Sequence, residues 1–200
     1  MIQQLMPQVV VFDFDGTLTR RDSFLEFVRF VHGRKALWFG LLRHAGALLL
    51  MMLHLVDHSR VKERVFSTFF RGMPYTTFCE LGRSFAEQVD RWNKDEMLSQ
   101  LKHHVEKGDR VYVVTASVEE WVCPWCERQG VLHVIGTQVE TDKEGRLTGR
   151  FKTKNCYGAE KVMRLLAWEP NRKEYRLKAY GDSRGDREML QFADEAKRVR

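Results

Sequence analysis

Two aspartates one residue apart near the start of the chain carry the clearest chemical signal. Asp13 and Asp15 follow the apolar run Val9-Val10-Val11-Phe12 and precede Gly16 and Thr17. Such a run is typical of a buried parallel strand, and open α/β sheets bind ligands at the carboxyl ends of these strands. Two carboxylates there repel each other unless a cation or a shared proton neutralises them. The pattern favours a metal-dependent site, with one aspartate attacking and the other moving protons, over a strand that merely ends in acidic turn residues.

A second apolar strand also ends in polar groups. Thr115, Ala116 and Ser117 follow it, and hydroxyls beside a helix N-terminus suit a phosphate. A plain helix cap explains Ser117 equally well. Lys161 lies early in a later predicted helix, where a solvated lysine is the ordinary alternative to an anion-binding one.

A third short strand ends in Gly181-Asp182-Ser183, and Asp186 follows four residues after Asp182. Hard cations such as Mg²⁺ prefer carboxylate oxygens. Asp182 is therefore a candidate direct ligand beside Asp13, and Asp186 a candidate ligand acting directly, through water or by orienting the others. Turn-forming residues are the alternative reading of this string.

Together, the four segments resemble the haloacid dehalogenase (HAD) superfamily of phosphotransferases, and within it the phosphoserine-phosphatase-like branch, subfamily IB. The resemblance covers nearly the whole chain and is weakest between the first and second motifs. It extends to poorly characterised hydrolases that neighbour a phosphatidylglycerophosphatase. The segments that carry it are Asp13 to Thr17, Thr115, Lys161, and Gly181 to Asp186.

The resemblance implies a Mg²⁺-dependent phosphatase. Asp13 would attack phosphorus and form an aspartyl-phosphate, while Asp15 would act as general acid and then base. Thr115 and Lys161 would bind the phosphoryl oxygens. The implied metal ligands are Asp13, Asp15 through its backbone carbonyl, Asp182 and Asp186, and the implied substrate-contacting residues are Gly16, Thr17, Ala116, Ser117 and Asp22.

The hydrophobic periodicity predicts which elements position these groups. Helical spacing is expected around 24–31, 59–70, 78–85 and 93–107, with Asn93 as a cap, followed by alternating strands and helices. Ser117 and Glu120 form a predicted capping box that opens the next helix. The remaining predicted elements are strands at 110–115, 134–135 and 177–180, helices at 158–168 and 186–192, a hairpin of 138–141 with 146–151, and the start of a last strand at 196–200.

The predicted fold class is α/β, a Rossmann-like parallel sheet core with helices on both faces, plus an inserted helical C1-type cap. We expect the core to comprise residues 1–20 and 93–200 and the cap insert residues 21–92.

Composition narrows the partners without choosing among them. The chain has 200 residues, 44% of them hydrophobic, and a net charge of +6. The basic balance favours anionic partners, namely a phosphorylated small molecule or a lipid, although a solvated basic surface without a partner gives the same balance. No basic stripe with interleaved aromatics is present, so nucleic acid is not expected. Without a secretory signal, we expect the protein in the cytoplasm or peripheral at the inner membrane surface.

Substrate selection should depend on the insert. Asp22 lies where phosphoserine phosphatases carry a glutamate that grips the substrate amine, but it also suits a helix cap. The segment from Ala36 to Val56 is almost entirely apolar and long enough to span a bilayer. It reads as a buried cap helix, as a membrane-surface or lipid-binding element, or as a span. The flanking cations Arg34, Lys35, Arg60 and Lys62 suit an anionic lipid surface.

We therefore expect a phosphomonoesterase whose substrate is either a phospholipid-type phosphate such as phosphatidylglycerophosphate, or a small metabolite such as phosphoserine. A remote alternative is a non-catalytic or redox protein on the same scaffold, with Cys123 and Cys126 as a CxxC pair or half a zinc site. Packing cysteines on one helix explain that pair more simply, and Cys156 reads as a small buried residue.

Overall fold

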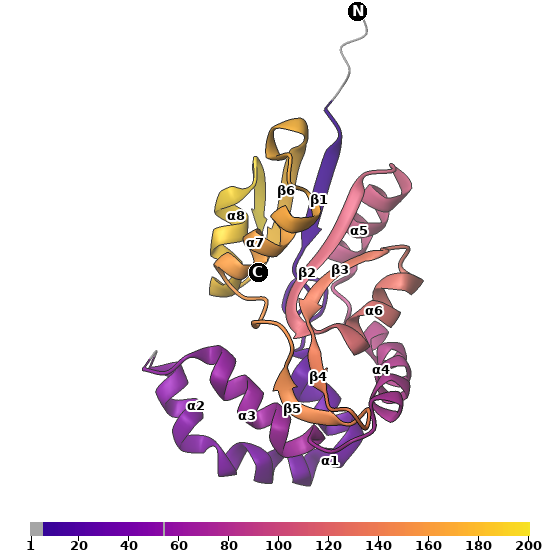
Figure 1. Ribbon diagram of the computed structural model, residues 1–200. Helices are drawn as coiled ribbons and strands as arrows, with labels where there is room; N and C mark the ends of the chain where they lie inside the picture. The colour runs from indigo at the N-terminus through magenta and orange to yellow at the C-terminus, as the bar shows by residue number, and fades with distance from the viewer. Residues whose placement is uncertain (1–5, 54) are drawn as a thin grey trace, which may run out of the picture.

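A five-stranded parallel sheet forms the centre of the computed structural model, which describes residues 6–53 and 55–200 (Figure 1). The strand order is β3-β2-β1-β6-β7, and every neighbouring pair is parallel. β1 therefore lies at the centre of the sheet. Strands β2 and β3 are added on one side of it, and β6 and β7 on the other. The strands are β1 Gln8–Phe12, β2 Arg110–Val118, β3 His133–Thr137, β6 Arg176–Gly181 and β7 Glu195–Arg198.

Alternation along β1 builds two apolar layers, one on each face of the sheet. Val10 lies in one cluster with Leu101, and Val11 in the other with Leu165. The predicted parallel α/β sheet with helices on both faces is confirmed. The helices are α5 Asp95–Glu106 and α6 Glu119–Arg128 against one layer, and α7 Ala159–Trp168 and α8 Arg187–Phe192 against the other.

Between β1 and α5, the described residues form four α-helices. They are α1 Ser23–Arg43, α2 Ala45–Met52, α3 His58–Phe70 and α4 Tyr75–Val89. Leu18 and Lys94 are joined by a 2.8 Å backbone hydrogen bond, and Arg20 and Trp92 by one of 2.7 Å. The segment that leads into the four helices, residues 18–20, therefore lies beside the segment that leaves them, residues 92–94. The division into a core of residues 1–20 and 93–200 and a cap of 21–92 stays a prediction.

An aromatic cluster packs the helices α1, α3 and α4 against α6, which covers the sheet. Phe27 of α1 stacks on Trp121 of α6 with ring centroids 4.5 Å apart, and packs against Phe70 and Phe85. The predicted hairpin forms as β4 Val139–Thr141 and β5 Leu147–Phe151, and it lies against α3 (Figure 1). Short 3-10 helices lie at Asp90–Trp92, Arg172–Glu174 and Arg184–Asp186.

Two predicted helix caps are wrong. Strand β2 runs on to Val118, so α6 begins at Glu119 and the Ser117–Glu120 capping box does not form. Asn93 does not cap α5, because its extended backbone pairs with Thr19 and the helix begins two residues later. In both places, long-range strand pairing outweighs the local cap. The last predicted strand, by contrast, forms as β7.

The apolar segment from Ala36 to Val56 is neither one continuous helix nor buried. Gly33, with φ 81° and ψ 167°, breaks α1 into two stretches, and His44 separates α1 from α2. Gly40 is the only buried residue among those of the segment that the structure describes, which exclude His54. Among the described residues, no helix is long and apolar enough to cross a membrane. The interpretation of the segment as one buried cap helix is therefore wrong, and no described helix within it has the length of a span.

Candidate active site

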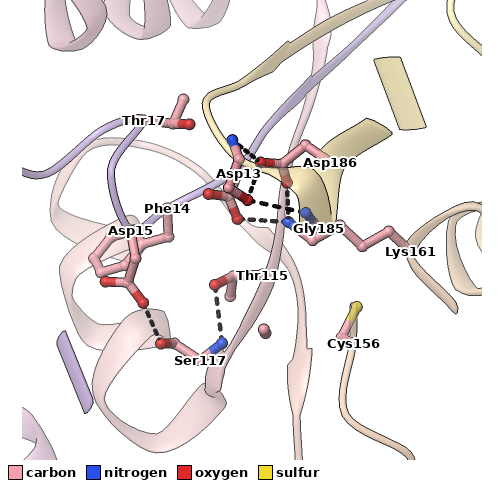
Figure 2. A network of polar contacts seen from close by, with 12 residues as sticks. Asp13, Phe14, Asp15, Thr17, Thr115, Ser117, Cys156, Lys161, Gly185 and Asp186 are labelled. Carbon is pink, nitrogen blue, oxygen red and sulfur yellow. Dashed lines mark hydrogen bonds and ion pairs between the residues drawn. The ribbon is translucent and has the colours of Figure 1, made fainter. Parts of the chain in front are cut away.

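The catalytic candidates gather where β1, β2 and β6 end (Figure 2). Asp13 directly follows β1 and Asp182 directly follows β6, so the register of the two strands brings them together. Gly16 makes the intervening turn possible: its φ of 79° suits glycine, and a Cβ there would overlap the Asp182 carboxylate. Thr17 Oγ1 donates to Asp182 Oδ1 at 3.3 Å.

Lys161 joins two of the aspartates. Its Nζ donates to Asp13 Oδ1 at 2.5 Å and to Asp186 Oδ1 at 2.6 Å, with the side chain only 2% exposed. Burial alone would lower the pKa of Lys161, but the two carboxylates outweigh it and raise that pKa. Burial raises the pKa of Asp13 to about 7, although Lys161 opposes the rise. Lys161 is therefore a fixed buried cation beside the predicted nucleophile.

Asp186 is the most fully hydrogen-bonded carboxylate of the group. Its Oδ1 accepts from Lys161, and its Oδ2 accepts from the Ser183 backbone N–H and the Ser183 hydroxyl, each at 2.9 Å. Burial would raise the pKa of Asp186, but Lys161 and the Ser183 donors hold it below its ordinary value. Because its oxygens are already occupied, Asp186 is placed to orient the other groups.

The acidic residues at this edge suit a divalent cation. Carboxylate oxygens of Asp13, Asp182 and Asp186 lie within 4.8 Å of one another. Burial and the negative charge of Asp186 raise the pKa of Asp182, which means that its ionised form is disfavoured. A bound cation stabilises that ionised form. An all-carboxylate donor set matches a hard cation such as Mg²⁺. The side chain of Asp15 lies outside this group.

The Asp15 carboxylate points instead toward Ser117 (Figure 2) and also accepts hydrogen bonds from Ser23. Its Oδ1 accepts from the Ser23 backbone N–H at 2.8 Å, and its Oδ2 accepts from the hydroxyls of Ser23, at 3.1 Å, and Ser117. Trp121 Nε1 in turn donates to Ser23 Oγ at 3.0 Å. Burial and the charge of Asp22 raise the pKa of Asp15 to about 6, against the pull of Ser117. A carboxyl with such a pKa is suited to proton transfer near neutral pH.

A cavity lies beside the acidic cluster, and only some of the other predicted substrate contacts line it. Thr115, Ala116, Gly16 and Asp22 line it, whereas Ser117 and Thr17 are buried beside it. Asp22 also caps α1, its Oδ1 accepting from Leu25 N at 2.9 Å, as one reading of the sequence predicted.

Lys62 of α3 is a cavity residue that the sequence did not reveal as such. Its Nζ donates to the Ala116 carbonyl at 2.8 Å. Burial lowers its pKa, and the nearby charges of Asp22 and Asp15 oppose that shift. The expectation that Lys62 faces a lipid surface is wrong, because α3 turns it inward. Only its helical spacing from the buried Val65 and Phe66 could have hinted at this.

The cavity has a volume of about 540 Å³ and a chemically mixed lining. The acidic cluster and Lys161 supply its charged groups. Leu41 from α1 and Leu48 and Met51 from α2 supply apolar groups. A ligand with a phosphate at one end and an apolar group at the other fits this lining.

The surroundings of Cys123 and Cys126 do not favour a reactive thiolate. Cys123 and Cys126 are free thiols; burial raises the pKa of Cys123 to about 12 and that of Cys126 well above its ordinary value. Raised thiol pKa values are the reverse of what a redox thiolate needs. Cys156 is fully buried, as expected.

A family model for haloacid dehalogenase-like hydrolases matches residues 10–191, which include every residue of the acidic cluster. The chain belongs to this family. It is a phosphatase, a phosphoric monoester hydrolase of HAD type. In this fold Asp13 and Asp182 follow the neighbouring parallel strands β1 and β6, and Lys161 reaches Asp13 from α7.

Three comparisons place this HAD hydrolase among known proteins. Protein CicA of Caulobacter vibrioides is 35% identical, covering 94% of this chain and 84% of the relative. Phosphoserine phosphatase SerB1 of Mycobacterium tuberculosis is 26% identical, over 92% of this chain and 62% of the relative. A crystal structure of a protein of unknown function from Bordetella pertussis Tohama I aligns with a TM-score of 0.82 at 20% identity, covering 96% and 89% of the two chains.

Proposed function

We propose that this phosphatase depends on Mg²⁺ and works through an aspartyl-phosphate on Asp13. The observation that carries the proposal is the meeting of a buried lysine and three carboxylates at one sheet edge. Lys161 holds one oxygen of Asp13, which leaves the other directed to attack. No other group of described residues combines carboxylates within reach of a cation with a cavity.

In the first step, an oxygen of Asp13 forms a bond to phosphorus as the ester P–O bond breaks. Asp15 gives its proton to the leaving alkoxide, while Lys161 and the backbone and hydroxyl around Thr115 stabilise charge on the phosphoryl oxygens. In the second step, Asp15 takes a proton from water, which attacks the phosphorus and frees Asp13 and inorganic phosphate.

Asp13, Asp182 and the Asp15 backbone carbonyl would hold the cation, with Asp186 orienting them through Ser183 and Lys161. When bound, Mg²⁺ supplies positive charge that offsets the negative charge of the transferred phosphoryl group.

For the substrate, we favour a phospholipid-type phosphate such as phosphatidylglycerophosphate. The support is that Leu41, Leu48 and Met51 line the same cavity as the acidic cluster. A phosphate ester of this kind resides in a bilayer, so contact with a membrane surface, and a peripheral location there, belong to the same proposal. The helical insert of residues 21–92 would be the cap that selects the substrate.

A small metabolite such as phosphoserine is the second candidate. Asp22 and Lys62, which both line the cavity, supply opposite charges that suit an amine and a carboxylate. A preference for phosphoserine over any lipid phosphate would favour this candidate.

The test is phosphate release from a panel that contains phosphatidylglycerophosphate in detergent, phosphoserine and sugar phosphates, with Mg²⁺ or with EDTA. We expect Mg²⁺-dependent release that Asp13→Asn reduces to background, because the variant lacks the nucleophile. Asp142→Asn, in the exposed hairpin turn, is the matched control and should keep full activity. Near-normal release by Asp13→Asn would overturn the mechanism.

A further inference from the structure

An arm of the helical layer exposes an unusual amount of apolar surface. The arm comprises residues 34–53, the part of α1 after the Gly33 break together with α2 and Leu53. In Figure 1 its α2 part lies at the edge of the helical layer, away from the sheet. The large apolar side chains exposed along it are Trp38, Phe39, Leu42, Leu49, Leu50, Met52 and Leu53, of which Phe39, Leu42 and Met52 are each 72% exposed.

The arm has two apolar sides. Leu41, Leu48 and Met51 line the catalytic cavity, while the exposed set faces solvent. Burial against the rest of the chain therefore accounts for only part of its hydrophobicity. Apolar patches of this kind are rare on monomeric proteins and mark sites of interaction.

The charges around the arm indicate what kind of partner covers its exposed surface. Residues 27–56 contain no aspartate or glutamate, whereas Arg34, Lys35 and Arg43 are exposed on the arm itself. Arg60 and Arg64 are exposed on the adjoining α3. A second copy of the chain would bring like charges together, which opposes self-association through this surface. A negatively charged surface with an apolar interior satisfies both the cations and the exposed side chains.

We propose that the apolar arm docks the protein on anionic lipid bilayers. Its exposed aromatic and aliphatic side chains enter the boundary between headgroups and acyl chains, and its cations contact lipid phosphates, as interfacial amphipathic helices do. This docking deepens the proposed function, because its purpose rests on a substrate drawn from the bilayer. The binding itself does not require turnover.

The first test is cosedimentation of the protein with vesicles of phosphatidylcholine alone or mixed with phosphatidylglycerol. We expect binding to the mixed vesicles that weakens with added salt. The double variant Phe39→Glu/Leu42→Glu should lower the partition coefficient by about tenfold or more, since it places two carboxylates in the interface. The matched control is Leu132→Glu/Met163→Glu, which changes two exposed apolar residues outside the arm and should bind as the unaltered protein does.

A second readout locates the contact. Trp38 and Trp168 are the exposed tryptophans, at 69% and 56%, while Trp121 and Trp125 are fully buried. Mixed vesicles should shift the tryptophan emission to the blue, and Trp38→Phe should remove that shift while cosedimentation persists. Trp168→Phe should keep it.

Three outcomes would overturn the docking: no binding to mixed vesicles, equal loss of binding in the control pair, or a dimer in sedimentation velocity that Phe39→Glu/Leu42→Glu dissociates. Release of phosphate from p-nitrophenyl phosphate by the arm variant shows that it is folded. Asp13→Asn should bind vesicles normally, so failure of the proposed mechanism and failure of docking are separable.

Discussion

The hydroxyl of Ser117 donates to Oδ2 of Asp15, although the two residues lie 102 positions apart. Ser117 belongs to β2 and Asp15 follows β1, so the contact depends on the parallel pairing of these strands. Ser23, the first residue of α1, donates to the same carboxylate. The predicted general acid is thus held at once by the sheet and by the first residue of the helical insert.

Substitution of this hydroxyl should impair proton transfer more than phosphate binding. We expect Ser117→Ala to lower kcat by about tenfold on alkyl phosphates, whose leaving groups need a proton, with little change in KM. On p-nitrophenyl phosphate, whose leaving group needs no proton, the rate of aspartyl-phosphate formation should change little, because Asp15 then acts only in the second step. Single-turnover kinetics on both substrates measure the first step separately. An equal loss on the two would mean that Ser117 supports the fold rather than Asp15.

Mg²⁺ should stabilise the folded chain through the acidic cluster. A ligand that binds only the native state adds about 2.7 kcal/mol at a concentration one hundred times its dissociation constant. Asp182→Asn should remove most of this gain, because it takes away a direct carboxylate ligand. Thermal denaturation with and without Mg²⁺ measures the effect. Glu96→Gln, an exposed residue on α5, is the control and should keep the whole Mg²⁺-dependent shift.

Sequence alone was sufficient for the parallel sheet and for the meeting of Asp13, Lys161 and Asp182. Strand-end placement and the HAD motifs both depend on local patterns, and parallel strands align their carboxyl ends. The inward turn of Lys62 and the two serines on Asp15 were not predicted. These contacts join residues distant in sequence through the packing of α3 and β2, so local patterns do not specify the partners of Lys62 and Asp15.

The same limit explains the misplaced caps. Ser117 has the residue type and spacing of a helix cap, but pairing of β2 with β3 extends the strand through Val118. The exposure of residues 36–53 was equally hidden, because an apolar run gives the same pattern whether it is buried or facing a partner.

Gly16 should tolerate no side chain. Alanine there would have to adopt a φ of 79°, and its Cβ would overlap the Asp182 carboxylate. The strained backbone alone costs about 1–2 kcal/mol of folding free energy, so Gly16→Ala should destabilise the fold by more than that. Gly145 is a matched control, with a φ of 71° and open space around its Cα. Gly145→Ala should cost only the backbone share. Urea denaturation of both variants compares them, and equal losses would contradict the overlap with Asp182.

Glu120 should make stability depend on pH. Its Oε1 accepts from the Tyr75 hydroxyl at 3.1 Å, while the buried Oε2 has no hydrogen-bond partner among the described residues. Burial raises the pKa of Glu120 from 4.5 to about 7. Between these values the native state binds more protons than the unfolded state, so the free energy of unfolding falls as pH rises through that window. The fall should be on the order of 3 kcal/mol and level off above about pH 7.

Glu120→Gln should remove this contribution, since an amide cannot ionise, while the raised pKa values of Asp13 and Asp15 keep a smaller dependence of the same sign. Relative to the unaltered protein, the variant should gain stability as pH increases from 5 to about 8, because only the unaltered protein then buries an unpaired carboxylate. Glu127→Gln, an exposed position on the same helix, should leave the pH profile unchanged. Denaturant unfolding at several pH values measures all three proteins. A Glu120→Gln profile parallel to that of the unaltered protein would show that another group carries the pH dependence.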